Sequence, residues 1–592
     1  MVGRPPHAAH TFEAMRNLVA LAVLWACLPL AAQPLKRVDA YTRADTLRGS
    51  MGPYRTWWDA VHYDVTVRPD FKGRSIRGTT TIRIQVVQPG QRMQIDLQQP
   101  LVVDSIKAEV AAAWAPYGTW GSEHVPFVRD GNVVWADFPG LLEAGSEFPV
   151  HVYYHGIPHV AQNPPWDGGW IWQKAPDGSP WMTVACQGLG ASVWYPCKDS
   201  QADEPDSAAL HIVVPDSLTG VGNGRLQGTT PNGDGTTTWH WKVGSPINNY
   251  NLVPYIGPYV HIGGTYPGQE GPLDLDYWVL RSNLPKAMEH FNQVPGILAC
   301  FEDWFGPYPF YTDGFKLVES PHLGMEHQSA IAYGNNYMNG YMGNDLSGTG
   351  WGLKWDFIIV HEGAHEWFGN NITTADIADM WVHEAFANYA EALYNECRFG
   401  PGAGADYVVG LRRNIRNDIP IVGPYGVNQE GSGDMYYKGS NLLHTIRHIM
   451  DNDSLFKGML REMNRRFRHS IVTGADIERF IIRYSQLDLA KVFDQYLRTT
   501  QVPELQWTVA KGQLWVRYAN CVEGFAMPTA ITLNGETRVV PIGTNWSSPA
   551  YGLKAKRASL EPDRNWYVTA RRVAPGMLKP QPPKMGARPK AE

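Results

Sequence analysis

Two histidines and two glutamates are spaced in this chain as the ligands and the base of a zinc site would be. His361, Glu362 and His365 lie in the stretch HEGAHEWFGN, and Glu384 lies in the later stretch WVHEAF. Positions i and i+4 of an α-helix stand on the same face, so the two imidazoles can bind one metal ion. Two histidines, one carboxylate and an open fourth position are typical of a catalytic zinc site rather than a structural one.

The third ligand requires the chain to turn back. On one continuous helix Glu384 would lie about 28 Å beyond His365, at about 1.5 Å per residue. The stretch GNN at 369–371 ends the first helical pattern, and a second helical pattern begins near Asp379. We therefore expect a helix, a turn and a second helix that together hold one zinc ion per chain.

The remaining member of the motif, Glu362, is the predicted general base. It directly follows a predicted ligand, so its side chain leaves the helix about 100° away from that of His361. Zinc activates water as a nucleophile. A carboxylate in this position can accept the proton of that water without binding the metal.

Three further stretches are PHLGMEH at 321–327, MYYKG at 435–439 and ACQGLGASVWYPCKD at 185–199. They resemble stretches of the gluzincin aminopeptidases, the family of aminopeptidase N and the leukotriene-hydrolase aminopeptidases. Together with the zinc motif they follow the order of that family. The resemblance covers most of residues 55–500.

The resemblance implies how a peptide substrate would be bound. It assigns substrate binding to Gly324, Met325 and Glu326, with the Glu326 carboxylate receiving the free α-amino group. It places Gln187 at the same end of the substrate. Tyr436 is implied to lie opposite the zinc and to stabilise the oxyanion.

The same resemblance implies a role for one more residue, and two residues differ from the family pattern. Asp379 matches a family position whose carboxylate hydrogen-bonds a zinc-ligating histidine. Leu323 stands where the family usually has a glycine, and His327 stands where it usually has an asparagine. Both departures concern the backbone and the support around Glu326.

The distribution of residue types predicts a multidomain α+β protein. Residues 40–280 carry short alternating apolar and polar stretches, residues 281–500 carry helical patterns, and residues 501–574 return to strand patterns. Residues 575–592 are rich in proline and lysine and are predicted to be disordered. By the resemblance these regions are an N-terminal β-sheet saddle domain, a thermolysin-like zinc catalytic domain with helices and a small C-terminal β domain.

The N-terminal residues predict export. An apolar run at 18–30 follows Arg16 and precedes Ala31, Ala32 and Gln33, which is the pattern of a signal peptide over 1–33. The run is too short to cross a bilayer comfortably, so no stable membrane span is expected after its removal. We therefore expect a periplasmic or secreted protein. Lipidation at Cys27 and a retained anchor stay open as alternatives.

Charge and cysteine content narrow the partners further. The formal net charge is −6, which gives no reason to expect nucleic acid as a partner. Beyond the predicted signal peptide no C-x-x-C pair occurs, so a cysteine zinc site is not expected. Whether Cys186 and Cys197 form a disulfide stays open at this point.

These observations predict a zinc-dependent aminopeptidase that hydrolyses the N-terminal peptide bond of peptides through a zinc-activated water. A zinc endopeptidase is an alternative because His327 replaces the family asparagine. A catalytically silent peptide-binding relative is another, although this chain keeps the three ligands, the base and the tyrosine. Epoxide hydrolysis is a further alternative.

Overall fold

The computed structural model describes residues 40–110, 121–549 and 559–578. The chain divides into two units, Met1–Ala32 and Gln33–Glu592, and only the second contains described residues. The predicted signal peptide at 1–33 therefore lies outside the described residues. No described helix is both long enough and apolar enough to cross a membrane.

A short helix that we did not predict precedes the first strand. This helix, α2 (Arg43–Gly49), begins after Thr42, whose side chain accepts a hydrogen bond from the backbone N–H of Asp45. The Asp45 side chain in turn accepts from the backbone N–H of Thr42, which completes a capping box. Arg48 of this helix lies 3.3 Å from the Asp199 carboxylate.

The region up to residue 257 is built mainly of sheets, as its alternating pattern predicts. One sheet joins eight described strands in the order β13-β14-β11-β1-β2-β8-β4-β5. All neighbours in it are antiparallel except the parallel pair of β1 and β11. The strands are β1 (Trp58–Asp70), β2 (Ser75–Val86), β4 (Val102–Val110), β5 (Gly121–His124), β8 (Glu147–Gly156), β11 (Ser207–Pro215), β13 (Arg225–Pro231) and β14 (Thr236–Val243).

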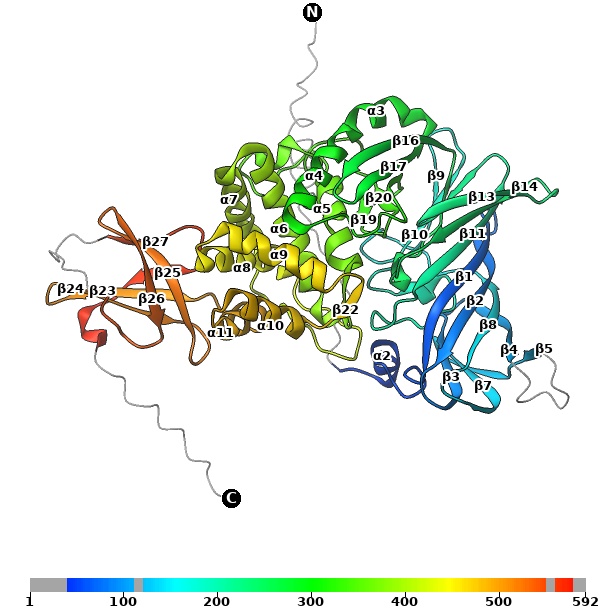
Figure 1. Cartoon of the computed structure of the whole chain (residues 1–592), viewed down its shortest axis with the longest axis horizontal. Coiled ribbons are helices and arrows are strands. Elements are labelled where there is room, and N and C mark those ends of the chain that lie inside the picture. The colour runs from blue at the N-terminus through cyan, green and yellow to red at the C-terminus, as the bar shows by residue number, and fades with distance from the viewer. Residues whose placement is uncertain (1–39, 111–120, 550–558, 579–592) are drawn as a thin grey trace, which may run out of the picture. The chain divides into compact units, whose positions relative to one another are not determined.

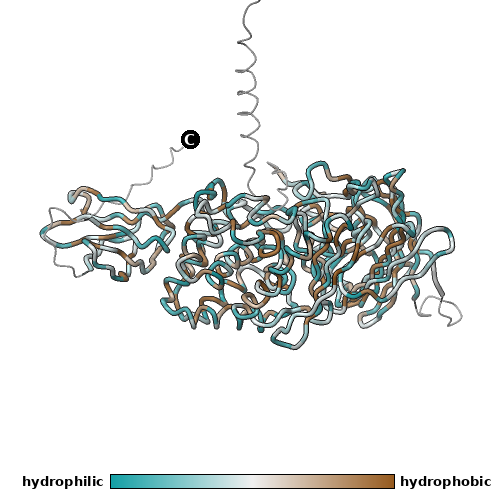
Figure 2. The backbone as a smooth tube through the Cα atoms, turned by 90° about the horizontal axis from the view of Figure 1, so that it is seen from above, coloured by the Kyte–Doolittle hydropathy of each residue, from teal (hydrophilic) through white to brown (hydrophobic). Residues whose placement is uncertain are grey.

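Two smaller sheets complete this region. The first has the order β12-β15-β10-β9 and the second the order β3-β7-β6. Their strands are β3 (Gly90–Asp96), β6 (Phe127–Asp130), β7 (Val133–Leu142), β9 (Gly169–Lys174), β10 (Pro180–Ala185), β12 (Thr219–Val221) and β15 (Tyr255–Gly257). From Tyr63 to Val67 every second side chain of β1, namely Tyr63, Val65 and Val67, is buried in one shared apolar core. Figure 2 shows the hydrophobic and hydrophilic stretches alternating along the backbone.

The zinc motif belongs to a part of the fold that begins earlier than the predicted boundary at 280. A mixed sheet has the order β16-β17-β18-β20-β19, and β17 pairs in parallel with β18. It contains β16 (Tyr259–Gly268), β17 (Gly271–Leu280), β18 (Phe315–Glu319), β19 (Gly324–Met325) and β20 (Ile331–Tyr333). The predicted boundary therefore falls inside one sheet. The alternating sequence pattern locates each strand, but it does not show which strands pair with one another.

Helices dominate the chain from there to residue 498, as predicted. They are α3 (Leu284–His290), α4 (Val294–Phe305), α5 (Phe357–Ala364), α6 (Trp381–Phe399), α7 (Pro401–Gly410), α8 (Asp434–Met450), α9 (Asp453–Arg466), α10 (Gly474–Ser485) and α11 (Ala490–Arg498). Two short strands, β21 (Ile372–Thr374) and β22 (Ser470–Val472), pair in parallel between them.

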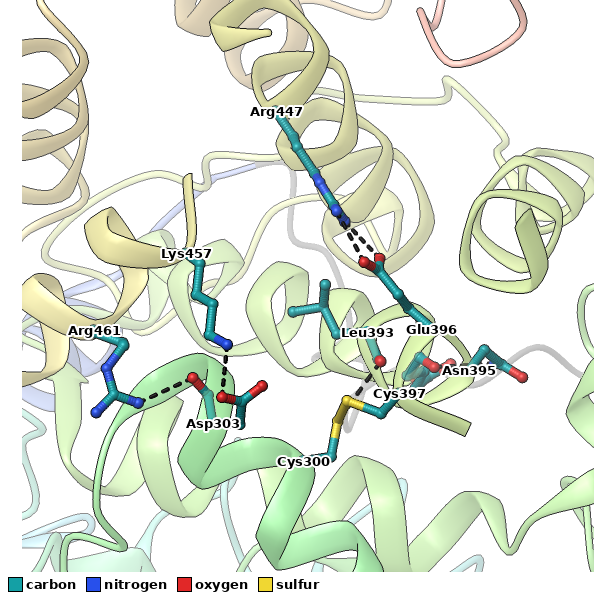
Figure 3. The surroundings of a disulfide bond; sticks show 10 residues. Cys300, Asp303, Leu393, Asn395, Glu396, Cys397, Arg447, Lys457 and Arg461 are labelled. Atoms are coloured by element: carbon teal, nitrogen blue, oxygen red, sulfur yellow. Dashed lines mark hydrogen bonds and ion pairs between the residues drawn. A yellow bond between two sulfur atoms is a disulfide. The ribbon is translucent and has the colours of Figure 1, made fainter. Parts of the chain in front are cut away.

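A disulfide between Cys300 and Cys397 joins α4 to the end of α6 (Figure 3). Ion pairs from neighbouring helices hold the same two helices: Arg447 of α8 binds Glu396 at 2.7 Å, and Lys457 of α9 binds Asp303 at 2.6 Å. Cys186 and Cys197 are both buried free thiols, so the pairing left open by the sequence is not formed.

The C-terminal region consists of two three-stranded sheets within the described residues. Their orders are β24-β23-β28 and β26-β25-β27. The strands are β23 (Glu504–Ala510), β24 (Gln513–Ala519), β25 (Ala526–Leu533), β26 (Glu536–Gly543), β27 (Leu560–Pro562) and β28 (Thr569–Arg572). The predicted disordered tail differs at its start, because Pro575–Leu578 form a short 3-10 helix. Its remaining residues lie outside the described ranges.

Candidate active site

The two histidines of the motif are carried by α5 and by the residue that follows it. The Asp356 side chain caps α5 by accepting the backbone N–H groups of Ile358 at 2.9 Å and Ile359 at 3.3 Å. After His365 the chain forms a π-helical turn, Glu366–Asn370, in which Gly369 adopts a φ of 121°. Glycine suits that backbone conformation, since a side chain would be strained there. The turn reverses the chain toward α6.

Three ligand atoms meet where this turn brings α5 and α6 together. His361 Nε2 and His365 Nε2 lie 3.3 Å apart. Glu384 Oε2 lies 3.5 Å from the first nitrogen and 3.4 Å from the second. All three side chains are buried. The structure thus brings together the three residues that the sequence predicts as zinc ligands.

The spacing and chemistry of these atoms fit a zinc ion. Bonds of about 2.0–2.1 Å in a tetrahedral site separate neighbouring ligand atoms by about 3.3–3.4 Å. Those separations match the three distances in the protein. Glu384 Oε2 is also buried without a hydrogen-bond partner among the described residues. A buried carboxylate oxygen without a partner is costly, and a metal ion would satisfy it.

The Nδ1 atoms of both histidines form hydrogen bonds with other residues of the protein. His361 Nδ1 donates to Glu391 Oε1 at 2.7 Å, and His365 Nδ1 donates to the backbone carbonyl of Phe368 at 2.9 Å. These contacts leave the Nε2 lone pairs directed toward the ligand cluster and fix the tautomers. Glu391 was not predicted, although its position seven residues beyond Glu384 places both on one face of α6.

The contact that the resemblance assigned to Asp379 is a different one in the structure. Its Oδ1 accepts the Tyr425 hydroxyl at 2.8 Å, and its Oδ2 accepts the backbone N–H of Gly474 at 2.9 Å. No hydrogen bond joins Asp379 to His361 or His365 among the described residues. Because Asp379 precedes α6 and Glu391 lies within it, only the second carboxylate reaches an imidazole of α5. The predicted contact of Asp379 is therefore wrong, and Glu391 supports His361, a predicted zinc ligand.

The environments of Glu362 and Glu384 shift the pKa values of their carboxyl groups in opposite directions. Burial raises the pKa of the Glu362 carboxyl to about 7, against the opposing charges of His361 and His365. Burial alone would also raise the pKa of Glu384, but the charges of the same histidines outweigh it and hold that pKa below its usual range. Two neighbouring carboxylates with such different environments are suited to different roles, one as a proton acceptor and one as an anionic ligand.

A second buried carboxylate cluster lies beside the metal site. Glu326 Oε1 accepts hydrogen bonds from Gln187 Nε2 and, at 3.0 Å, from the hydroxyl of Tyr250. Carboxylate oxygens of Glu326 and Glu362 and a ring nitrogen of His365 all lie within 4.8 Å of one another. The structure thus brings Gln187 and Glu326 together next to the predicted base. Tyr250 comes from a 3-10 turn, Asn249–Asn251, and no sequence motif indicated it.

Gly324 and Met325 form the strand at the edge of the mixed sheet. β19 pairs with β20 on one side only, and Gly324 lies opposite Tyr333. A Cβ atom at Gly324 would lie 2.8 Å from Glu362 Oε1 and 2.9 Å from the Ile358 side chain. The absence of a side chain here therefore lets the strand approach the predicted base. A free edge of this kind can pair with the main chain of a bound peptide.

The residues that depart from the family pattern are buried in this neighbourhood. His327 Nδ1 lies 2.5 Å from the Tyr255 hydroxyl, while its Nε2 has no hydrogen-bond partner among the described residues. The backbone carbonyl of Leu323 accepts the N–H of Gly334 at 2.8 Å. Glu326 is supported by Asn370, whose side chain donates to the Glu326 carbonyl at 2.8 Å.

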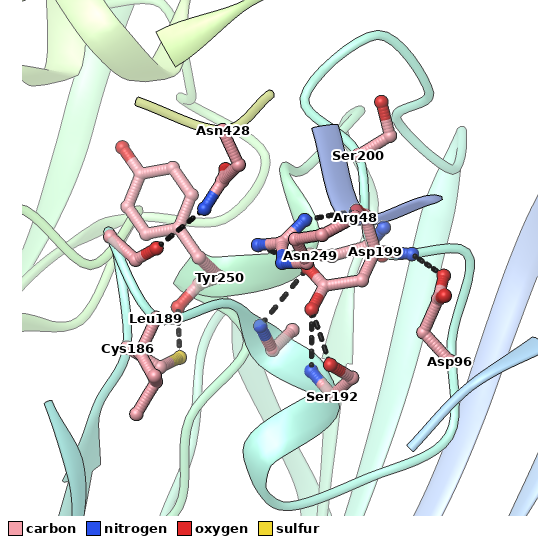
Figure 4. A network of polar contacts seen from close by, with 12 residues as sticks. Arg48, Asp96, Cys186, Leu189, Ser192, Asp199, Ser200, Asn249, Tyr250 and Asn428 are labelled. Atoms are coloured by element: carbon pink, nitrogen blue, oxygen red, sulfur yellow. Dashed lines mark hydrogen bonds and ion pairs between the residues drawn. The ribbon is translucent and has the colours of Figure 1, made fainter. Parts of the chain in front are cut away.

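The segment that carries Gln187 is held by Asp199, as Figure 4 shows. The Asp199 carboxylate accepts the backbone N–H groups of Ala191 at 3.2 Å and Ser192 at 3.1 Å. Arg48 binds it at 3.3 Å, and Asn428 donates to the carbonyl of Gly188 at 3.1 Å. The segment is thus tied both to α2 and to the catalytic region, which fixes the position of Gln187.

Tyr436 and Tyr437 face different partners. The ring of Tyr436 stacks on that of His361 with centroids 5.9 Å apart. Burial raises the pKa of the Tyr436 hydroxyl well above its usual range, so this hydroxyl stays protonated and can donate a hydrogen bond. The Tyr437 hydroxyl is buried without a partner among the described residues. Of the two, Tyr436 is the one that lies against the metal site.

Two helices that bring candidate metal ligands together across a turn, beside the free edge of a mixed sheet, form an arrangement that suits a zinc metallopeptidase. Comparison with known proteins agrees, since the Peptidase family M1 domain matches residues 289–418. Human aminopeptidase B (Homo sapiens) is 23% identical over 492 residues, which cover 75% of this chain and 70% of that protein. Leukotriene A-4 hydrolase of Xenopus laevis is 20% identical over 489 residues, which cover 77% of this chain and 75% of that protein.

A solved structure shows the same fold. The crystal structure of an M1 zinc metallopeptidase from Deinococcus radiodurans matches with a TM-score of 0.61 and 20% identity, covering 77% of this chain and 96% of that one. The domain match and these relatives support the gluzincin aminopeptidase family and the activity of a zinc metallo-aminopeptidase. The predicted multidomain α+β fold is confirmed.

Proposed function

We propose that this enzyme removes N-terminal residues from peptides that carry a free α-amino group, with one zinc ion per chain held by His361, His365 and Glu384. The observation that carries the proposal is the buried carboxylate of Glu326, which lies within 4.8 Å of the Glu362 and His365 ligand atoms. A substrate ammonium bound there would form charge-assisted hydrogen bonds with it. So short a distance leaves room for one residue between the ammonium and the scissile bond.

The protein's own residues have distinct roles in this proposal. When bound, zinc acts as a Lewis acid that activates water and polarises the scissile carbonyl. Glu362 accepts the proton of the attacking water and returns it to the leaving amine. The Tyr436 hydroxyl donates to the carbonyl oxygen as negative charge develops on it. The free edge of β19 aligns the main chain of the substrate.

Cleavage of internal peptide bonds would require a site that is open on both sides. An endopeptidase must admit chain on both sides of the scissile bond, whereas Glu326, Gln187 and Tyr250 close one side with a buried polar cluster. A neutral acetamide group placed there would remove the ammonium and leave the Glu326 carboxylate without its cationic partner. The cluster therefore favours removal of single N-terminal residues.

The test compares matched substrates on zinc-loaded protein. A panel of free aminoacyl fluorogenic amides and their N-acetylated counterparts is assayed with wild type and with Glu326→Gln. Wild type is expected to cleave the free substrates at least about 100-fold faster than the acetylated ones, since the loss of a buried charge pair costs about 3–5 kcal/mol. Glu326→Gln is expected to lower the ratio of the cleavage rate of free substrates to that of acetylated substrates. Equal cleavage of acetylated substrates by wild type would refute the aminopeptidase proposal, and no cleavage at all would favour the silent relative.

We also propose that the enzyme is periplasmic or secreted. The apolar run at 18–30 supports export, and the disulfide between Cys300 and Cys397 is of a kind that persists in oxidising compartments. N-terminal sequencing of the mature protein after expression of the full chain tests this. Cleavage near residue 33 is expected, whereas an uncleaved N-terminus in the cytosolic fraction would contradict the proposal.

A further inference from the structure

A cavity of about 820 Å³ lies between α9, α10 and the segment that follows α4. None of its lining residues is a proposed zinc ligand, base or substrate-binding residue. The two helices are neighbours in the fold (Figure 1). Along α10 the lining positions recur every three or four residues, so one face of that helix forms a wall. The lining residues of the two helices are Gly458, Arg461, Glu462, Asn464, Arg465 and Arg466 on α9, and Asp476, Arg479, Phe480, Arg483 and Tyr484 on α10.

The walls of this cavity are strongly basic in an acidic chain. Three acidic residues, Glu270, Glu462 and Asp476, line it beside six arginines. Six positive and three negative charges leave a local excess of three positive charges, whereas the whole chain has a formal net charge of −6. The arginines are Arg461, Arg465, Arg466, Arg468, Arg479 and Arg483. We call this site the arginine cavity.

In two of these arginines the guanidinium group pairs with no acidic side chain among the described residues. Neither Arg466 nor Arg483 forms a hydrogen bond or an ion pair with any residue in the described ranges, and both are exposed. Arg466 lies over the ring of Phe467 with 5.9 Å between guanidinium carbon and centroid. Their donors are therefore free to bind a ligand.

Two other arginines of the cavity form ion pairs that are exposed to solvent. Arg465 pairs with Glu462 at 2.6 Å, and Arg468 pairs with Glu270 at 3.2 Å. Exposed pairs of this kind contribute little to stability, so a ligand anion can replace them.

Aromatic rings lie beside these cations. Phe467 and Phe480 meet edge to face with centroids 5.6 Å apart, and Phe480 contacts Tyr484 at 5.8 Å. All three rings line the cavity. The cavity therefore offers an apolar aromatic surface next to guanidinium groups that have no anion.

We infer that the arginine cavity binds a small organic polyphosphate with an aromatic part, the chemistry of a nucleoside triphosphate. Guanidinium forks bind phosphate oxygens in bidentate fashion, which favours arginine over lysine at such sites. The aromatic rings provide a face on which a base can pack. The volume lies in the range of about 300–1,000 Å³ that is usual for small-molecule sites.

The experiment measures binding by calorimetry to the zinc-loaded full chain, with all probes compared at the same ionic strength and ATP then repeated at higher salt. The probes are ATP, tripolyphosphate and adenosine, which carry both chemical parts, the charge alone and the ring alone. ATP is expected to bind at least about tenfold more tightly than either partial probe, because only ATP engages the guanidinium groups and the rings together. Its affinity is expected to fall as salt rises, since the contacts are ionic and largely exposed.

A double variant, Arg466→Gln with Arg483→Gln, tests the site itself. Neither side chain forms a hydrogen bond or an ion pair with a described residue, so the variant is expected to fold normally and to bind ATP at least about tenfold more weakly. Arg77→Gln is the matched control, because Arg77 is an exposed arginine of β2 outside the cavity, and it is expected to leave ATP binding unchanged. Absence of ATP binding, binding that survives in the double variant, or equal binding of tripolyphosphate would each overturn the inference.

Discussion

Replacing Glu391 by glutamine should weaken zinc binding although Glu391 does not bind the metal. Glu391 Oε1 accepts His361 Nδ1 at 2.7 Å and the Asn388 side chain at 2.8 Å, and Oε2 accepts the Tyr407 hydroxyl at 2.6 Å. A glutamine can keep its oxygen toward His361 and Asn388, and the Tyr407 hydroxyl can rotate to accept from the new amide. The variant therefore removes mainly the negative charge behind the imidazole.

The size of the effect follows from that contact. A hydrogen bond to a charged group contributes about 1.5–3 kcal/mol and a neutral one about 0.5–1.5 kcal/mol, so about 1–1.5 kcal/mol is lost at His361. This corresponds to roughly tenfold weaker zinc binding, the lower end of the about 10–100-fold range for partners of metal ligands. Glu391→Ala should be far more damaging, because it leaves three buried donors without an acceptor.

Asp379→Asn is the matched control for this prediction. The Asp379 carboxylate accepts hydrogen bonds from Tyr425 and Gly474 rather than from a metal-binding histidine. Its variant should keep zinc affinity within about twofold and lose some folding stability instead. Competition with a chromogenic zinc chelator gives the affinities, and urea unfolding gives the stabilities. A loss of zinc affinity in Asp379→Asn that equals or exceeds the loss in Glu391→Gln would show that Glu391 is not the residue that supports the zinc-binding histidine.

Two further predictions concern the oxyanion donor and the disulfide. Tyr436→Phe should lower kcat by roughly 10² to 10³ with little change in KM, whereas Tyr437→Phe should do much less; steady-state kinetics of both variants decides, and equal small losses would contradict the role of Tyr436. Cys397→Ser opens a loop that spans 97 residues from Cys300 and should lower the free energy of unfolding by about 4.7 kcal/mol in the chain-entropy model. Denaturant unfolding measures this against Cys521→Ser, which removes a thiol without opening a loop, and equal stabilities of the two variants would show that the disulfide contributes nothing.

The sequence predicts the metal site well because its geometry is local. The four-residue spacing of His361 and His365 and the turn at 369–371 determine how one helix presents its ligands and how the next returns. The partners of these ligands depend on how α5 and α6 pack. Because of that packing, Glu391 rather than Asp379 contacts His361. The spacing of residues in the sequence does not reveal how the two helices pack.

Residues from distant loops and sheets were harder to predict for the same reason. Tyr250 reaches Glu326 from a 3-10 turn in the β region, a contact between positions 76 residues apart. The sheet that contains β17 and β18 crosses the predicted boundary because strand pairing is decided by tertiary contacts. The capping box of Thr42 and Asp45 is local, by contrast, and it was a usable signal for α2.

In the proposed mechanism His361, His365 and Glu384 hold a zinc ion while Glu362 moves the proton. The most direct test measures zinc content and turnover on the same preparations of wild type and Glu362→Gln. We predict one zinc per chain in both proteins and a turnover about 10² to 10⁴ lower in the variant, the usual range for loss of a positioned general base. A variant that retains zinc and turns over at a near-normal rate would contradict the account, as would a wild-type enzyme that is fully active without bound metal.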